Sequence, residues 1–245
     1  MVFHGMNGGH GNLQGVILDM DGVIIDSHPA HHLAWQEFLE AVGQSVSDAE
    51  LKYILDGRKR NEILRHFFGK LSDEEILEYG TRKHEFFRRV SLEVKPVAGI
   101  LEFLNQAKQA GIGLAIATSA SGSRTRSTLE RLLVTDHFQV IVTGDDVDFG
   151  KPDPAIYRLA CQRLDISPDS AVAVEDAVSG IKAAKGAGIC CVAVSGHESA
   201  KKLRHAGANH VIENFISFSL ADLRSILRRN HQRFGPRQNT ANAAV

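Results

Sequence analysis

The sequence predicts an α/β protein in which a doubly wound parallel sheet carries an inserted all-helical domain. Two observations predict this fold class. Six short apolar runs, rich in valine, isoleucine and alanine, alternate with amphipathic stretches along most of the chain. Between residues 29 and 94 the alternation stops, and only helical patterns are found. Strand and helix in alternation are typical of a parallel sheet covered by helices, and the interruption indicates an insertion.

The six apolar runs are expected to be strands buried on both faces. They lack the strict alternation of apolar and polar residues that marks a half-exposed strand. Each is also too short to be an independent helix, whereas its content of branched residues favours a strand. Strands are therefore expected at residues 15–18, 114–117, 140–142, 171–174, 190–194 and 210–212.

The stretches between the later strands have helical periodicity. Apolar residues recur every three or four positions from Ile100 to Ala107, before Gly111, and glycine commonly ends a helix. A similar pattern follows Pro154, which suits a first helical turn, and another precedes Gly188. Helices between successive parallel strands give a Rossmann-like core.

The insertion is expected to be a helical cap. Prolines near its two ends, Pro29 and Pro96, stiffen the chain and indicate hinges. We therefore expect an α/β core at residues 13–28 and 95–229, a helical cap at 29–94, and flexible tails at 1–12 and 230–245. Cap helices are expected at 31–42, 48–55, 61–68 and 73–90.

Composition narrows the range of partners. The 245 residues carry a formal net charge of −1, so no bulk electrostatic attraction to nucleic acid or an anionic membrane is expected. No apolar stretch approaches the roughly 20 residues that span a bilayer, and the first residues lack the apolar segment of a secretory signal. Three cysteines form neither a disulfide framework nor a common zinc spacing, which favours a reducing cytoplasm.

Polar residues follow four of the predicted strands at the point where each strand ends. In open α/β sheets, ligands bind at this carboxyl edge. Alone, each residue is better explained as a turn or helix cap, whereas the joint pattern is harder to explain in that way. The residues are Asp19, Asp21 and Gly22 after the first strand, Thr118 and Ser119 after the second, Lys151 after the third, and Glu175 and Asp176 after the fourth.

The chemistry of this edge follows from its charges. Carboxylates brought close together repel unless a cation lies between them, and oxygen ligands without cysteine favour Mg²⁺ over Zn²⁺. A lysine and a threonine hydroxyl beside such a cluster suit a phosphoryl group, which one carboxylate can attack at phosphorus. Backbone N–H groups from Gly22 onward can donate to the same oxygens.

These residues resemble the motifs of the haloacid dehalogenase superfamily, in the branch that contains β-phosphoglucomutase and small sugar-phosphate phosphatases. The resemblance extends from Leu13 to about Leu227. The four motifs occur in order, which makes the match specific. They are Asp19-Met20-Asp21-Gly22-Val23, Thr118, Lys151 within Gly150-Lys-Pro-Asp-Pro154, and Glu175-Asp176.

The resemblance implies a role for each motif residue. Asp19 is expected to be the nucleophile that forms an aspartyl-phosphate, and Asp21 the general acid and then base. Thr118 and Lys151 are expected to hold the transferring phosphoryl group. Mg²⁺ is expected to bind Asp19, the Asp21 carbonyl and Asp176, with Glu175 nearby. Dehalogenases of the superfamily lack the second acid, so Asp21 argues against dehalogenation.

The substrate is expected to be a small phosphorylated metabolite, handled by a monomer or homodimer. By the same resemblance, Ser27, His31, Arg60, Lys83 and Ser119 are expected to contact it. The mutase of this branch carries a Ser-Lys-Asn stretch after the second motif, whereas residues 120–122 read Ala-Ser-Gly here. Arg124 or Arg126 is a candidate replacement for the missing lysine. This departure favours a phosphatase, with β-phosphoglucomutase as the alternative.

Two functions of another class also fit parts of the pattern. Receiver domains in signalling combine a doubly wound sheet with acids, Mg²⁺, Thr or Ser and Lys-Pro, although they lack a helical insertion and are shorter. A catalytically inactive binding protein of the same fold is the second alternative, which the intact motifs oppose.

Some single residues also have structural explanations. In the cap, His31 could be an ordinary packing residue, and Trp35 is expected in the cap core. Asp145 and Asp146 are expected to stabilise the loop before Lys151.

Overall fold

The computed structural model describes residues 12–91 and 94–234. All six expected strands are present and form one parallel sheet in the order β3-β2-β1-β4-β5-β6. Two strands are one residue longer than expected, each at one end. The strands are β1 (Gly15–Leu18), β2 (Gly113–Ala117), β3 (Val140–Val142), β4 (Ala171–Glu175), β5 (Cys190–Val194) and β6 (His210–Ile212).

The central strand β1 pairs in parallel with β2 on one side and β4 on the other. All four of its residues are buried, as its uninterrupted apolar sequence predicts. Val16 and Leu18 face one apolar cluster, whereas Ile17 faces the other. The sheet therefore has a core on each side, which is the doubly wound arrangement.

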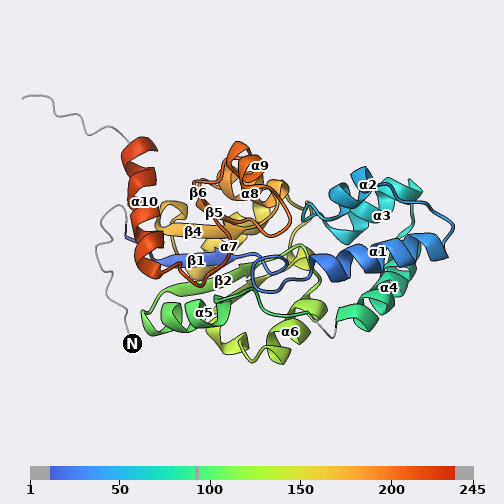
Figure 1. Cartoon of the computed structure of the whole chain (residues 1–245), viewed down its shortest axis with the longest axis horizontal. Coiled ribbons are helices and arrows are strands. Elements are labelled where there is room, and N and C mark those ends of the chain that lie inside the picture. Colours follow the sequence, from blue (N-terminus) through green and yellow to red (C-terminus); the bar gives the residue numbers. More distant parts are fainter. Residues whose placement is uncertain (1–11, 92–93, 235–245) are drawn as a thin grey trace, which may run out of the picture.

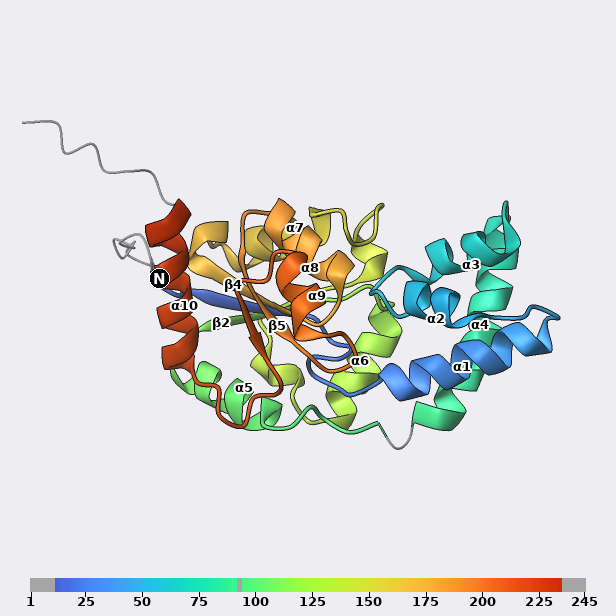
Figure 2. The same cartoon turned by 45° about the horizontal axis from the view of Figure 1, so that its top comes forward.

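Helices cover both faces of the sheet (Figures 1 and 2). The apolar residues of α5 and α10 pack on the Val16 side, and those of α7, α8 and α9 pack on the Ile17 side. The core helices are α5 (Ile100–Gln109), α6 (Gly122–Arg131), α7 (Ala155–Leu164), α8 (Val178–Gly186), α9 (Ala200–His205) and α10 (Leu220–Phe234), with 3₁₀ turns at Thr135–His137, Gly144–Asp146 and Pro168–Ser170.

The insertion contains the four helices that the sequence predicts, and they form a lobe beyond the carboxyl edge of the sheet (Figure 1). They are α1 (His28–Ala41), α2 (Asp48–Ile54), α3 (Arg60–Phe68) and α4 (Asp73–Val90). The side chains of Trp35 and Phe38 are buried in an apolar cluster of this lobe, as expected. Capping boxes at Ser47 and Ser72 begin α2 and α4.

Two boundaries differ from the expectation. Helix α1 begins at His28 instead of residue 31, and Pro29 lies in its first turn, where a missing N–H costs nothing. Helix α10 continues through Phe234, past residue 229, and its Asn230 side chain accepts a hydrogen bond of 2.6 Å from the Asn209 amide. Most of the two expected tails lies outside the described residues.

Two further observations concern the chain as a whole. Over the described residues, none of the helices has the length and apolar content to cross a membrane. Cys161, Cys190 and Cys191 are buried and unpaired. Burial raises the pKa of each thiol, so the thiolate form is disfavoured.

Candidate active site

The carboxyl edge of the sheet brings the sequence motifs together. Asp19 and Thr118 extend the ladder of the central strands, since their backbone N–H groups donate to Val174 (2.9 Å) and Val142 (3.0 Å). Asp19, Thr118 and Asp176 line one cavity of about 500 Å³ between the sheet edge and the helical lobe. The convergence expected from the edge rule is therefore confirmed in space.

Lys151 connects the acids of this edge. Its buried amine lies 2.7 Å from Asp19 Oδ1 and 2.5 Å from Glu175 Oε1, and donates to the Ala117 carbonyl at 2.9 Å. Burial alone would lower the pKa of Lys151, but the two carboxylates outweigh it and raise that pKa. The lysine therefore stays charged, with all three of its donors in use. The Tyr157 hydroxyl also donates to Glu175, at 2.6 Å.

Asp19 has more negative than positive neighbours. Burial is the main cause that raises its pKa, and the charges of Glu175, Asp176 and Asp21 add to this effect, while Lys151 opposes it. One oxygen each from Asp19, Glu175 and Asp176 lies within 4.8 Å of the others. An oxygen-only donor set with excess negative charge fits Mg²⁺, which would favour the ionised form of Asp19.

Asp21 is held differently, by donors instead of acids. The Arg124 guanidinium grips both of its oxygens, at 3.0 Å for Oδ1, and the Ser27 hydroxyl donates to the same Oδ1. His31 Nε2 lies 3.3 Å from Oδ1. Burial would raise the pKa of Asp21, but Arg124 and His31 hold it well below its ordinary value. Asp21 is therefore ionised here.

The wall opposite these acids belongs to the helical lobe and carries basic side chains. Lys83 is buried, contacts His31 Nδ1 at 3.0 Å, and lies 5.0 Å from the Trp35 ring and 4.9 Å from the Phe87 ring. Burial, then the charge of Arg124, holds the pKa of Lys83 well below its ordinary value. Burial, and next Lys83, lowers the pKa of His31 to about 3, so this imidazole is neutral.

Arg60 is the second basic residue of that wall. Its guanidinium lies against Gly80 of α4, where an added Cβ would approach Arg60 Cζ to 2.6 Å. Burial lowers the pKa of Arg60, and Asp145 opposes this effect. Arg60 and Lys83 both line the cavity, as the resemblance implies for substrate contacts.

The loop between α2 and α3 holds the lobe against the core. The Ser119 hydroxyl donates to the Gly57 carbonyl at 2.7 Å, and Lys59 Nζ donates to the Val147 carbonyl at 2.7 Å. The Gly150 N–H donates to Glu62 at 3.1 Å. Ser119 lines the cavity, but its hydroxyl is engaged in this junction.

Gly22 differs from its expected role. Its N–H was expected to donate to a phosphoryl oxygen, but it donates to the Ile25 carbonyl at 2.7 Å. The reason is the tight turn that follows β1, in which Gly22 has φ +74°. An added Cβ would lie 2.0 Å from Asp176 Oδ2, so glycine is required for space as well as for conformation.

Asp145 and Asp146 have the structural roles expected of them. Asp145 accepts a hydrogen bond of 2.8 Å from the Gly122 N–H at the start of α6. Asp146 accepts from the backbone and hydroxyl of Thr143, both at 2.8 Å, and pairs with Arg163.

Sequence reasoning missed three residues that contact the motif acids, and it gave a fourth, Arg124, a different role. Tyr157 lies on the buried face of α7, and a tyrosine among apolar positions indicates a hydroxyl that needs a partner. His197 follows β5, so the edge rule applied to the fifth strand would have found it. His28 and Arg124 carry weaker signals, because each reaches its acid from a helix start. The acids that they contact are Asp176 for His28 and His197, Asp21 for Arg124 and Glu175 for Tyr157.

Comparison with known proteins identifies the family. The haloacid dehalogenase-like hydrolase profile matches residues 16–194. The chain is 37% identical over 179 residues to a phosphorylated carbohydrates phosphatase of Thermotoga maritima, covering 72% of this chain and 82% of that protein. It is 34% identical over 191 residues to the β-phosphoglucomutase of Bacillus subtilis, covering 74% and 83%.

A solved structure gives the same result. The crystal structure of CbbY from Rhodobacter sphaeroides in complex with phosphate superposes with a TM-score of 0.73 at 31% identity, covering 86% of this chain and 99% of that one. These relatives support an enzyme, a phosphatase or phosphoglucomutase, over a receiver-like signalling module. The chain therefore belongs to the haloacid dehalogenase-like hydrolases, in the branch of the β-phosphoglucomutases and sugar-phosphate phosphatases.

Proposed function

We propose that this protein hydrolyses a small phosphorylated carbohydrate, with Asp19 as the nucleophile. The observation that carries the proposal is the position of Asp19 between a buried, charged Lys151 and a cavity of about 500 Å³. A cavity of this size suits a small metabolite. Its opposite wall presents Arg60 and Lys83, which suit an anionic substrate. The similarity to the Thermotoga maritima phosphatase of phosphorylated carbohydrates supports the same substrate class.

Asp19, Glu175 and Asp176 would hold Mg²⁺, together with the Asp21 carbonyl that the resemblance implies. When bound, the ion would neutralise phosphoryl oxygens and the excess negative charge of the acids. Lys151, whose three donors are already engaged, would act on the phosphoryl group through its charge from behind Asp19. Thr118 Oγ1 accepts from the Ala120 N–H at 3.2 Å, which leaves the hydroxyl hydrogen free to donate to the phosphoryl group.

The reaction has two steps. An Asp19 oxygen attacks phosphorus and forms the aspartyl-phosphate, while the ester oxygen leaves with a proton from Asp21. Water then attacks phosphorus, Asp21 takes a proton from that water, and the bond to Asp19 breaks to release phosphate. Asp21 must therefore gain a proton before the first step. A substrate anion that draws Arg124 away would raise the pKa of Asp21 towards this protonated form.

β-Phosphoglucomutase is the second candidate. The similarity to the Bacillus subtilis enzyme and the cavity positions of His31, Arg60 and Lys83 favour it. The absence of the Ser-Lys-Asn stretch opposes it, and Arg124, the candidate replacement, is engaged with Asp21. We therefore place the phosphatase first.

The nucleophile is tested by Asp19→Asn, because an amide cannot attack phosphorus. We expect hydrolysis of an aryl phosphate to fall by about 10³-fold or more, the scale on which enzymes lose activity with their nucleophile. The exposed neighbour Asp26 gives the matched control, Asp26→Asn, which should retain activity. Mass spectrometry of the quenched wild-type reaction should find a phosphoryl adduct on the peptide that contains Asp19. Wild-type turnover by Asp19→Asn would refute the assignment.

The metal and the substrate are tested together. Thorough chelation should abolish hydrolysis, and Mg²⁺ should restore it; activity that survives chelation would refute the metal site.

A panel of hexose, pentose and hexitol monophosphates is then assayed for released phosphate. Beside it, β-glucose 1-phosphate with a trace of the bisphosphate is assayed for glucose 6-phosphate. Free phosphate supports the phosphatase, whereas glucose 6-phosphate assigns the mutase.

We also propose the division into a core at 13–28 and 95–229 and a cap at 29–94. Hinges at Ser27–Pro29 and Lys95–Pro96 would let the cap open for substrate.

Two further expectations concern the whole protein. The three unpaired cysteines suit a reducing cytoplasm. The protein is expected to be a monomer or a homodimer, and analytical ultracentrifugation would distinguish the two.

A further inference from the structure

We propose that His28, His197 and Asp176 form a second cation site, which takes a transition-metal dication of the zinc class. The site adjoins the oxygen-only cluster and shares Asp176 with it. Its two histidines lie outside the four motifs, so it is distinct from the oxygen-only set although the two share Asp176.

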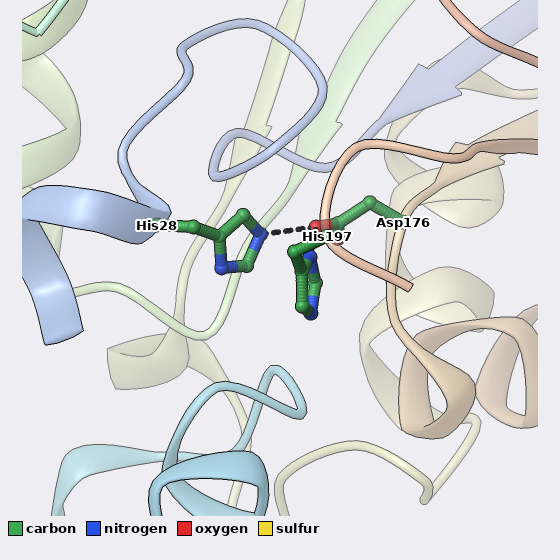
Figure 3. Close-up of side chains that lie close together, drawn as sticks. All are labelled: His28, Asp176 and His197. Atoms are coloured by element: carbon green, nitrogen blue, oxygen red, sulfur yellow. Dashed lines mark hydrogen bonds and ion pairs between the residues drawn. The ribbon is translucent and has the colours of Figure 1, made fainter. Parts of the chain in front are cut away.

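The three side chains converge on one point from three parts of the fold (Figure 3). His28 begins α1, Asp176 follows β4, and His197 follows β5. His28 Nε2 contacts Asp176 Oδ2 directly, and His197 Nδ1 lies 3.4 Å from the same oxygen. Two ligands on one tetrahedral zinc, with bonds of about 2.0–2.1 Å, lie about 3.3 Å apart. The spacing of His197 and Asp176 is therefore that of two ligands on a common ion, whereas His28 and Asp176 touch directly and would move apart when the ion binds.

The packing of the two rings also points to a cation. Their centroids are 3.5 Å apart with an interplanar angle of 35°, and one ring nitrogen of each faces Asp176. Two protonated rings this close would repel each other. A dication accepts one lone pair from each neutral ring and one from the carboxylate, so it satisfies all three groups at once.

The donor types determine which ion this site selects. Imidazole nitrogen binds Zn²⁺, Co²⁺ and Ni²⁺ well, whereas Mg²⁺ prefers oxygen. Two histidines and one carboxylate are a common ligand set for zinc that keeps an open coordination position. The neighbouring set of Asp19, Glu175 and Asp176 offers oxygen alone. The two sets would therefore bind different ions.

The point where the three side chains converge is uncrowded by the backbone and open to solvent. At Gly22, an added Cβ would lie 2.0 Å from Asp176 Oδ2 and 2.6 Å from His28 Nε2, so the glycine keeps the point of convergence clear. The His197 side chain is 22% exposed, which gives an ion a path from solvent. Because Asp176 belongs to both sets, an ion in one site must change the affinity of the other, and the coupling is reciprocal.

The test measures metal binding without substrate, so its outcome does not depend on the proposed hydrolysis. All proteins carry His4→Gln and His10→Gln, which removes two N-terminal histidines as competing ligands. The chelated protein is titrated with Co²⁺ in millimolar Mg²⁺, with visible absorption and equilibrium dialysis as readouts. We expect one Co²⁺ per chain with nitrogen ligation. Replacing His28 and His197 by glutamine should weaken binding by about 10-fold or more.

The matched control replaces two exposed histidines outside the cavity, His205 and His210, and should bind Co²⁺ like the wild type. A second readout does not depend on replacing either histidine. X-ray absorption of the Zn²⁺-loaded protein, with His28 and His197 intact, should find two imidazole ligands. Oxygen-only ligation, no binding in Mg²⁺, or equal affinity in the His28→Gln/His197→Gln protein would each overturn the proposal.

Discussion

Two buried lysines lie on either side of the cavity, Lys151 behind the core acids and Lys83 in the wall of the helical lobe, and their surroundings are opposite. Lys151 in the core is 1% exposed and lies beside Asp19 and Glu175, which raise its pKa. Lys83 in the helical lobe is 6% exposed and lies against aromatic rings and the neutral His31. Within the described residues, no carboxylate lies at ion-pairing distance from Lys83, and its pKa is well below the ordinary value.

The charge balance around Lys151 is complete without a ligand, whereas the charge balance around Lys83 is not. In the core, the charge of Lys151 is already balanced by Asp19 and Glu175, so the lysine fixes Asp19 in place. In the lobe, the desolvation cost of Lys83 is not offset within the protein, and an anionic ligand would offset it. The lobe therefore has the electrostatics of a surface that recognises substrate, as the proposed function requires.

Removal of the core lysine should produce the largest change in stability. Lys151→Met leaves Asp19 and Glu175 buried without their cation, so the free energy of unfolding should fall by about 3–5 kcal/mol. Chemical denaturation measures it, with the exposed Lys108→Met as control. A loss no larger than that of Lys108→Met would mean that Lys151 does not stabilise the acids.

Removal of the lobe lysine should change the free energy of unfolding in the opposite direction. Lys83→Met replaces an unbalanced amine with an apolar chain among Trp35 and Phe87. The free energy of unfolding at pH 7 should rise by about 2 kcal/mol. The same variant should lose sugar-phosphate binding, which is measured as a higher KM. A destabilised Lys83→Met protein would contradict the claim that burial of Lys83 costs stability.

The pH dependence sharpens this prediction. A lysine whose pKa is lowered by folding binds fewer protons in the folded than in the unfolded state, so stability rises with pH between the two pKa values. The advantage of Lys83→Met over wild type should therefore shrink as pH approaches about 10, where the unfolded lysine also loses its proton. Denaturation curves from pH 7 to pH 10 measure this, and a constant difference would exclude the assigned cause.

The smallest change in stability is expected at the junction between the core and the helical lobe. Ser119→Ala removes the hydrogen bond to the Gly57 carbonyl and should cost about 1 kcal/mol. Hydrogen exchange should rise in the loop between α2 and α3, whereas the exposed Ser127→Ala should leave it unchanged. Unchanged exchange in Ser119→Ala would show that this contact does not hold the lobe.

The sequence by itself determined the sheet and the motif acids. Buried parallel strands need uninterrupted apolar residues, and 15–18 or 190–194 can be little else in this context. Because parallel strands end at one edge, Asp19, Thr118 and Asp176 had to meet there once the strands were assigned. Backbone geometry carries this inference, so it needs no knowledge of distant contacts.

The tertiary structure alone decided which side chains reach those acids from elsewhere. Arg124 could have been a free phosphate ligand, but the position of α6 places it on Asp21. His28 and His197 are 169 residues apart, and the two meet only because the start of α1 and the loop after β5 lie over Asp176. Local patterns encode strands and helices, whereas contacts of this kind depend on how helices and loops are oriented, which packing of the whole chain determines.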